Sequence, residues 1–542
     1  MRTRQTLHRW GMVAALIVAM AGQIASVPAT FAAAQVDVPP AEYPPLAASP
    51  EFVEAECDFE KDDLPASLKA ADNVTCGTVA VPQDHENPEG DTIEIFVVKV
   101  ASTGKNPSPT PFLLLAGGPG QAGSDVLAIF DDDTWGTYAS WTPLFEDRDA
   151  YLIDQRGTGR TRPAVICPAD RDTDPESDSS FDDESAAPGE DAEQAVTAAD
   201  YYGDCAATLL DEGIDLQTYT NRQSAADLDV VRQAIGARRV DLIGISYGTW
   251  LGLEMMRYYP DSIRSVVLSS PVPPQSRFFD GSMFGFQDSL NAVYEGCAAD
   301  PQCDAAFPDL ERTFQKTIRK LDAKPMSLTF EDPTTGEETT ADATGQDLMS
   351  LVFQLMYSGP AVSFIPSLIG SVAAGDDELF ALLVPALISA SDGIGTALHY
   401  AVICQDELPF VDVDEVFADA EQAGISQQVI DDERVSVENY VGLCDAWDLP
   451  PSSEIENEPV ESNIPTLILT GKFDPITPTS GGEEALKTLP NGILIESPVA
   501  GHDPLSTSGT CCMDVTRAFL NTPRAELDTS CFDDLTMDFS PT

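Results

Sequence analysis

A serine between two glycines has the residue types and the setting of a catalytic nucleophile. The G-x-S-x-G sequence 244–248 lies between an apolar stretch, 240–245, and an amphipathic stretch, 247–258. In a sharp strand-to-helix turn, small residues on both sides of the serine relieve backbone crowding, and the hydroxyl stands at the positive end of the helix. An ordinary glycine turn without a catalytic role could have the same G-x-S-x-G sequence. The position between a predicted strand and a predicted helix favours Ser246 as a nucleophile.

A serine nucleophile needs a base that takes its proton, and the chain has only four histidines. His8 lies in the N-terminal segment, His85 in a predicted first hairpin, and His399 in a predicted insertion. His502 remains, on a loop directly after the last predicted strand. We therefore predict His502 as the base.

The base needs an acid that orients it, and Asp474 follows the apolar stretch 466–469 directly. The order serine, acid, histidine along the chain is the one expected on a parallel sheet of this type. Asp474 precedes a proline, so it could instead form a turn. Asp503 is a weaker candidate, because a residue rarely reaches the ring of its neighbour in sequence.

Two backbone N–H groups should stabilise the oxyanion that forms during acyl transfer. We predict that one is the amide of Tyr247, immediately after the nucleophile. The other is predicted at Gly118, in the Gly-Gly-Pro-Gly loop 117–120, where bare backbone can approach a ligand. A loop shaped only by glycine and proline is the alternative for Gly118.

The elements around these residues predict an α/β fold. Short apolar runs, each ending in a loop, are typical of buried parallel strands. A Ser-capped helix is predicted at 224–235 and a second helix at 247–258. Strands that alternate with helices predict a mostly parallel, twisted sheet with helices on both faces. The predicted strands are 78–81, 92–100, 111–116, 150–154, 240–245, 265–268, 466–469 and 493–495.

The chain divides into segments of different composition. A basic start, an apolar run and a small-residue site predict a signal peptide over 1–34, with a retained membrane anchor as the alternative. An extended lead-in follows over 35–70. The sheet is predicted in two parts, 71–274 and 461–542, with an acidic loop insert at 168–200. A mainly helical cap domain, 275–460, is inserted between the two parts.

Charge and cysteine content narrow the class of protein. The 90 Asp and Glu against 29 Lys and Arg give a net charge of −61, which repels nucleic acid and anionic lipid. The 11 cysteines of an exported chain are disulfide candidates. Neighbours along the chain suggest the pairs 57–76, 167–205, 297–303 and 404–444, and Cys531 with Cys511 or Cys512. No C-x-x-C pair occurs and the histidines are few, so we predict no structural zinc site. The predicted chemistry of Ser246, His502 and Asp474 implies no metal and no cofactor.

Several motifs together resemble the exported proline iminopeptidase and tripeptidyl aminopeptidase family of α/β-hydrolases. The likeness covers most of 76–531 and lies in CGTVAVPQDHENPEGDTIEIFVVKV (76–100), AGGPGQAGS (116–124), DQRGTGRT (154–161), GISYGTW (244–250), TGKFDPITP (470–478), GHDP (501–504) and RAELDTSC (524–531). The resemblance implies an α/β-hydrolase fold and the triad Ser246, Asp474 and His502. One departure is Ala116 before Gly117, where many members have His.

The family's activity implies a site for the ammonium group of a free N-terminus. Asp406 and Glu407, beside Cys404 in the predicted cap domain, are the candidates, although both could be solvated surface acids. The Glu- and Asn-rich motif of some short iminopeptidases is not evident, so specificity for single prolines is not supported.

The sequence therefore predicts a secreted or periplasmic serine hydrolase, with peptides that have a free N-terminus as substrates. We expect an aminopeptidase that releases short peptides or single residues through an acyl-enzyme. One alternative is an exported carboxylesterase with the same triad. Another is a non-catalytic binding protein on a hydrolase scaffold. Neither nucleic-acid binding nor a membrane span after signal removal is expected.

Overall fold

A computed structural model describes residues 5–6, 43–46, 48–57, 68, 73–129, 141–168, 197–331, 338–389, 395–425 and 427–541. The predicted signal peptide therefore lies outside the described residues, apart from the short strand β1 (Gln5–Thr6). Most of the predicted acidic loop insert also lies outside them.

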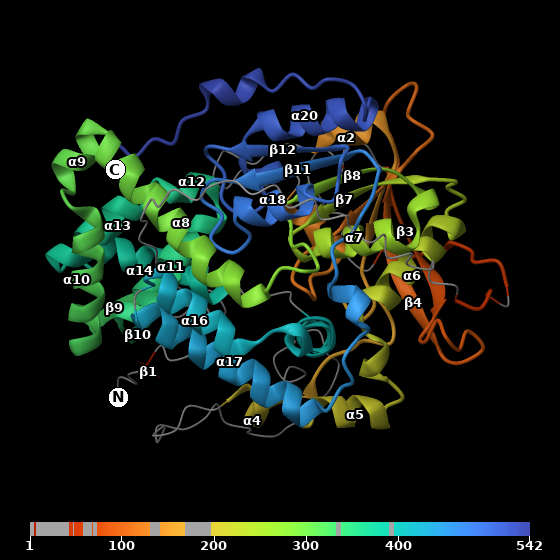
Figure 1. The fold of residues 1–542 in the computed structure, drawn as a ribbon, viewed down its shortest axis with the longest axis horizontal. Helices are drawn as coiled ribbons and strands as arrows, with labels where there is room; N and C mark the ends of the chain where they lie inside the picture. The colour runs from red at the N-terminus through yellow and green to blue at the C-terminus, as the bar shows by residue number, and fades with distance from the viewer. Residues whose placement is uncertain are drawn as a thin grey trace, which may run out of the picture.

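A nine-stranded sheet lies in the right part of the molecule in Figure 1, in the order β12-β11-β8-β7-β5-β6-β4-β3-β2. All neighbours from β12 to β6 are parallel, and the last three strands continue the sheet in antiparallel fashion. The strands are β2 (Val53–Ala55), β3 (Val74–Pro82), β4 (Thr92–Val100), β5 (Phe112–Leu115), β6 (Ala150–Ile153), β7 (Val240–Ile245), β8 (Ile263–Ser269), β11 (Thr466–Gly471) and β12 (Gly492–Ser497).

The inner strands are mostly apolar because helices cover both faces of the sheet. In β5, Leu113 and Leu115 pack into one core with α6 (Asn221–Ala234) and α7 (Tyr247–Tyr258). Phe112 and Leu114 point to the opposite face, into a core with α2 (Thr142–Asp147) and α20 (Thr510–Asn521). This arrangement is the α/β-hydrolase fold, and it confirms the predicted fold class.

Six further short helices lie between strands of the sheet: η1 (Gly123–Ile129), α4 (Ala198–Tyr202), α5 (Cys205–Asp211), η2 (Leu216–Thr218), η3 (Pro260–Ser262) and α18 (Thr479–Leu486). Two more, α19 (Pro504–Thr507) and η7 (Ser530–Asp534), follow the last strand, β12.

Helix α6 begins earlier than its apolar pattern predicted. Its N-cap is Thr220, whose hydroxyl accepts the N–H of Gln223, and not Ser224 as predicted. The first turn is buried although its residues are polar, because Asn221 and Gln223 hydrogen-bond to other parts of the protein. The helical spacing of apolar residues therefore begins about one turn after the first residue of the helix.

The chain between β8 and β11 forms a mainly helical body with its own apolar core, which lies beside the sheet in Figure 1. We call this body the cap. It also contains a hairpin, β9 (Met326–Glu331) and β10 (Glu338–Ala343), which the sequence analysis missed; β1 pairs with β10. Its helices are α8 (Phe278–Ala299), α9 (Pro301–Ala306), α10 (Leu310–Ala323), α11 (Gly345–Tyr357), α12 (Gly359–Val362), α13 (Ile365–Ala374), α14 (Glu378–Ser389), α15 (Thr396–Val402), η4 (Ile403–Glu407), η5 (Leu408–Phe410), α16 (Val413–Ala423), α17 (Gln427–Trp447) and η6 (Glu454–Asn457).

Five disulfides join the cysteines that lie near one another in the chain, which confirms the predicted pairs. Of the two open choices, Cys511 bonds to Cys531, and Cys512 is a buried free thiol. The other disulfides are 57–76, 167–205, 297–303 and 404–444.

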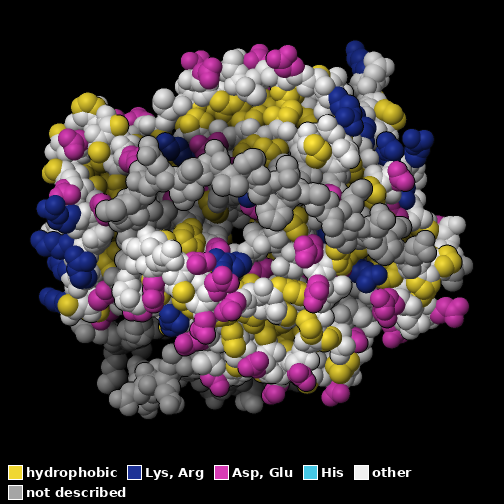
Figure 2. Space-filling model, in the orientation of Figure 1, with side chains coloured by type: hydrophobic (Ala, Val, Ile, Leu, Met, Phe, Trp, Pro, Cys, Tyr) yellow, Lys and Arg dark blue, Asp and Glu magenta, His cyan; other side chains and the backbone are white. Residues whose placement is uncertain are grey.

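The excess of acidic residues is visible on the surface. Asp and Glu side chains are scattered over the face of the molecule in Figure 2, whereas Lys and Arg gather at fewer places. Among the described residues, none of the helices combines the length and the apolar character needed to cross a bilayer.

Candidate active site

Ser246 occupies a strained turn between β7 and α7. Its backbone has φ 54° and ψ −126°, a region that L-residues rarely adopt and that costs about 1–3 kcal/mol. A Cβ at Gly244 would lie 2.4 Å from the carbonyl oxygen of Gly248, and one at Gly248 would lie 2.1 Å from that of Leu115. Both positions therefore require glycine, and the turn holds Ser246 at the N-terminus of α7.

His502 and Asp474 meet on neighbouring loops. Asp474 follows β11 and His502 follows β12, so parallel strand ends bring them to one edge of the sheet. The Nδ1 atom of His502 lies 3.0 Å from Oδ2 and 3.1 Å from Oδ1 of Asp474. The carboxylate is buried, and it also accepts hydrogen bonds from the hydroxyls of Ser270 and Thr477, both at 2.6 Å.

The surroundings tune both titratable groups of this pair. Burial alone would raise the pKa of Asp474, but the charge of His502 and hydrogen bonds from His502, Ser270 and Thr477 outweigh it and lower the pKa. Burial alone would lower the pKa of His502, but the charge and hydrogen bond of Asp474 raise it above the usual value. The pair is therefore arranged to stabilise a positively charged imidazole.

The predicted nucleophile and the predicted base line the same cavity, which has a volume of about 1250 Å³. Ser246, Tyr247, Gly118 and His502 all line it, while Asp474 lies buried behind the imidazole. The cap supplies much of the opposite wall through residues of α8, α11, α15 and α17. The catalytic and oxyanion residues predicted from the sequence thus lie around one cavity.

The two predicted oxyanion donors flank Ser246. Tyr247 is the first residue of α7, where the N–H groups have no partner within the helix. The loop 117–120 lies against the nucleophile, since a Cβ at Gly117 would lie 3.1 Å from Cβ of Ser246. Gly118 has φ 105° and a Cβ there would meet the N atom of Gly120 at 2.6 Å, so only glycine fits this turn.

Asp503, the alternative acid, and His85, a histidine set aside in the sequence analysis, both have partners outside the predicted triad. Asp503 accepts a hydrogen bond from the Ser269 hydroxyl at 2.8 Å, so Asp474 and not Asp503 contacts the imidazole. His85 is buried, and its Nε2 lies 2.7 Å from Oδ1 of Asp227, which also pairs with Arg156.

Asp406 and Glu407 do not line the cavity, so their predicted contact with a substrate ammonium group is not supported. Both are buried, within η4. Asp406 accepts the N–H of Asn221 at 2.7 Å and the hydroxyl of Ser452, and burial raises its pKa to about 7. Its carboxyl caps the N-terminus of α6, a role set by packing between segments that are distant in sequence.

Sequence reasoning missed several residues at the cavity. His399 lines it although the histidine lies in the cap, and its ring faces Pro119 and Tyr440. Thr477 binds Asp474 and also lies 3.0 Å from Nδ1 of His502. The motif did carry a signal for Thr477, because Asp474 accepts its N–H at 2.9 Å in the turn that the Asp-Pro sequence predicts.

Comparisons with known proteins show which proteins this chain is similar to. A family model described as TAP-like protein matches residues 432–531. The serine protease Hip1 of Mycobacterium tuberculosis is 22% identical over 467 residues, which cover 84% of this chain and 86% of Hip1. Tripeptidyl aminopeptidase of Streptomyces lividans is 29% identical over 224 residues, 41% of this chain and 39% of that protein.

The chain is a serine hydrolase with a TAP-like region. Carboxylesterase B of Mycobacterium tuberculosis is also similar to this hydrolase, with 25% identity over 439 residues that cover 76% of this chain and 78% of the esterase. The relatives of the hydrolase thus include both peptidases and an esterase.

Proposed function

We propose that this hydrolase is an exported aminopeptidase that cleaves short peptides or single residues from free N-termini through an acyl-enzyme. One observation carries the proposal: Ser246 and His502 open onto the same cavity, and buried Asp474 holds Nδ1 of that histidine. The similarity to a serine protease and to a tripeptidyl aminopeptidase supports peptides as the substrate class.

In this mechanism, Ser246 attacks the carbonyl carbon of the scissile bond. Because Nδ1 of His502 faces Asp474, the opposite ring nitrogen, Nε2, takes the serine proton and then passes it to the leaving amine. Water then attacks the acyl carbon and loses a proton to Nε2. Nε2 returns this proton to the Ser246 oxygen as the ester bond breaks, which releases the acyl group as an acid and restores the free serine. Asp474 holds the tautomer and stabilises the imidazolium in both steps.

The amides of Tyr247 and Gly118 bind the oxyanion of each tetrahedral intermediate. Their value lies in being positioned before the charge develops, and one such donor is worth about 3–4 kcal/mol in comparable sites. Gly118 lines the cavity beside Ser246, and Tyr247 begins the helix whose N-terminus faces it.

Carboxylates of α8 replace Asp406 and Glu407 as candidates for binding the substrate amine. Asp280 and Asp288 both line the cavity, eight residues apart on one helix. Oδ1 of Asp280 is buried without a hydrogen-bond partner among the described residues, while its other oxygen accepts from Arg277. Partial withdrawal from water raises the pKa of both carboxyls, and an ammonium group bound beside them would offset that effect and favour their charged form.

Export is supported by the disulfides and by the predicted signal peptide. Five disulfides use ten of the 11 cysteines, and such bonds persist in oxidising compartments. We therefore propose a secreted or periplasmic location, which N-terminal sequencing of the protein from the culture medium or periplasm tests.

The triad is tested by Ser246→Ala, with Ser480→Ala as the matched control because Ser480 is another serine at the cavity. We expect a fluorophosphonate probe to label the wild type and Ser480→Ala but not Ser246→Ala, which should fold normally and lose turnover. Wild-type turnover by Ser246→Ala would refute the triad. Absence of labelling in the wild type would favour a non-catalytic binding protein.

Similarity to a carboxylesterase makes an exported esterase the second candidate. A panel of Ala-Ala-Pro-, Pro- and Ala-anilides beside nitrophenyl esters separates the two. An aminopeptidase should lose activity when the peptide amine is acetylated, and Asp280→Asn should raise KM for the free peptide only. Equal turnover of free and acetylated substrates would favour the esterase.

A further inference from the structure

The cap is attached to the loop that carries Gly118. Helix α15 begins against this loop, where the N–H of Gly395 donates to the carbonyl oxygen of Gly120 at 2.8 Å. One turn later, Nδ1 of His399 lies 3.2 Å from the carbonyl oxygen of Pro119. Both contacts reach carbonyls just after Gly118, so the cap holds the loop at two successive residues.

The ring of His399 has one proton arrangement that satisfies both of its partners. A carbonyl oxygen can only accept, so Nδ1 must carry the hydrogen that faces Pro119. Removal from water lowers the pKa of His399 to about 4, and the ring is neutral at ordinary pH. Its Nε2 is then an acceptor, and the hydroxyl of Tyr440 donates to it at 2.9 Å.

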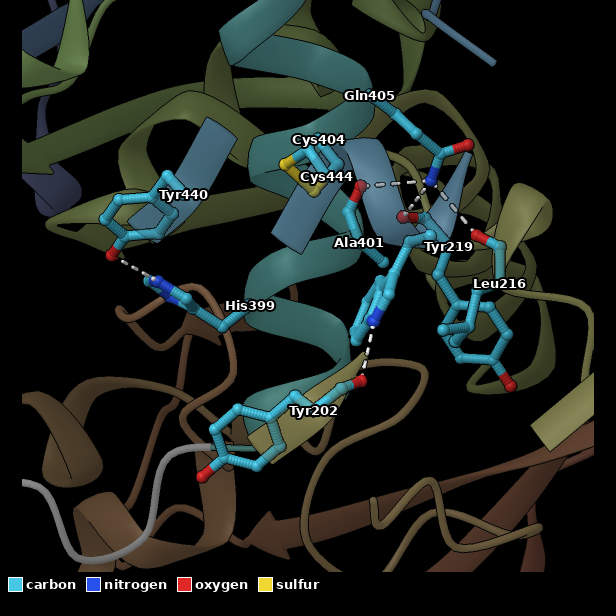
Figure 3. Close-up of a disulfide and its surroundings, with 10 residues drawn as sticks. Tyr202, Leu216, Tyr219, His399, Ala401, Cys404, Gln405, Tyr440 and Cys444 are labelled. Carbon is cyan, nitrogen blue, oxygen red and sulfur yellow. Dashed lines mark hydrogen bonds between the residues drawn. A yellow bond between two sulfur atoms is a disulfide. The ribbon is translucent and has the colours of Figure 1, made fainter. Parts of the chain in front are cut away.

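The two side chains stand on helices that a disulfide joins. Figure 3 shows His399 and Tyr440 pointing toward each other beside the Cys404–Cys444 bond. Cys404 follows His399 by five residues on α15 and η4, and Cys444 follows Tyr440 by four on α17. The ring of Tyr440 also packs against Tyr400 at a centroid distance of 5.6 Å. The disulfide and the packing of Tyr440 together restrict how His399 can move.

The loop itself needs such support. Gly118 and Gly120 adopt φ values of 105° and 110°, and glycines of this kind permit many backbone conformations in the absence of outside contacts. An oxyanion donor works only when its N–H is fixed before the charge develops. Contacts from the cap at Pro119 and Gly120 supply that restraint.

We propose that His399 is a positioning residue for the oxyanion hole: Tyr440 orients its ring, and its Nδ1–H holds the Pro119 carbonyl so that the Gly118 amide points at the oxyanion. This inference rests on the proposed function, because it assumes Gly118 as a donor. It gives the cap a part in catalysis besides enclosing the substrate.

The test compares His399→Phe, which keeps a ring but loses both hydrogen bonds, with His399→Asn, whose amide can still donate to Pro119. We expect kcat to fall about 10- to 100-fold in His399→Phe with KM nearly unchanged, and to recover most of this loss in His399→Asn. Tyr440→Phe should give an intermediate loss. Tyr400→Phe keeps the ring that packs against Tyr440, so it is the control and should leave kcat unchanged.

A second measurement separates oxyanion positioning from fold damage. A peptide aldehyde forms a tetrahedral adduct with an oxyanion, so His399→Phe should weaken its binding by the same factor as kcat. Binding of the released peptide acid, which forms no such adduct at Ser246, should stay unchanged.

Three outcomes would overturn the inference. A rise in KM without loss of kcat would make His399 only a wall of the substrate site. Equal losses in the Phe and Asn variants, with reduced thermal stability, would indicate a structural role. Unchanged aldehyde binding would exclude the oxyanion hole. By contrast, turnover by Ser246→Ala would refute the proposed function itself, whatever the His399 variants do.

Discussion

Gly471 and Gly501 meet backbone to backbone, between the loops that carry Asp474 and His502. A Cβ at Gly471 would lie only 2.0 Å from the carbonyl oxygen of Gly501. Hydrogen bonds on either side join the same two loops, including Phe473 N–H to the Ala500 carbonyl at 2.9 Å. The close approach of two glycines therefore keeps the loops of Asp474 and His502 close together.

Gly471→Ala should separate these loops. The methyl group meets backbone, which cannot move aside cheaply, so we expect a loss of about 1–3 kcal/mol in unfolding free energy. A shift of about 1 Å between Asp474 and His502 can lower kcat about 100-fold. Denaturant melts and steady-state kinetics check both effects.

Gly252→Ala is the control for this glycine substitution. A Cβ at Gly252, within α7, would meet only side-chain atoms at 3.7 Å or more. We expect it to keep full activity, because alanine also favours a helix. Full activity in Gly471→Ala as well would show that the contact between the loops does not align the pair.

The pH dependence of activity should report the His502 pKa. The base must be neutral to take the serine proton, so kcat/KM should fall as the pH drops through that pKa. Asp474 raises the pKa, which puts the midpoint of this acid limb above the usual histidine value of 6.5. Asp474→Asn should move the midpoint to lower pH and lower kcat by about 10³- to 10⁴-fold.

Asp503→Asn is the comparison variant for the pH dependence of kcat/KM. Asp503 adds a smaller charge effect on His502, so its removal should shift the midpoint less, in the same direction. An unchanged midpoint in Asp474→Asn would mean that a different group controls the acid limb.

Much of the site was predictable because it depends on short-range rules. Ser246 stands at a turn that the flanking glycines make possible, and the position of Asp474 and His502 follows from parallel strand ends meeting at one edge of the sheet. Disulfides between cysteines close in sequence were predictable for the same reason.

What could not be predicted depends on packing between distant segments. Asp406 has the chemistry of an ammonium-binding residue, but the chain buries it against Asn221, 185 residues away in sequence. His399 was set aside because of its place in the chain, yet folding brings it to the loop 117–120. Neither relationship leaves a spacing pattern, because each joins the cap to the sheet domain.

Cys512 should be unreactive until the protein unfolds. All other cysteines are in disulfides, and burial raises the pKa of this thiol to about 12. A thiol reagent under native conditions should therefore find no reactive group, and in denaturant without reductant it should find one. More than one thiol in denaturant would contradict the five disulfides.

The buried carboxyl of Asp406 should make stability depend on pH. Its pKa is raised from 3.8 to about 7 by burial, so the folded state binds a proton that the unfolded state releases. Its contribution to stability is therefore fully present below about pH 4 and is lost as the pH rises toward 7.

Asn resembles the protonated carboxyl, with an N–H group in place of the O–H. Asp406→Asn should therefore gain thermal stability relative to the wild type between pH 5 and pH 8, as measured by melting temperature. Asp412→Asn, at the cap of α16, is a matched control on an exposed carboxylate and should show no such gain. A constant difference between Asp406→Asn and the wild type across this range would mean that Asp406 stays ionised in the fold.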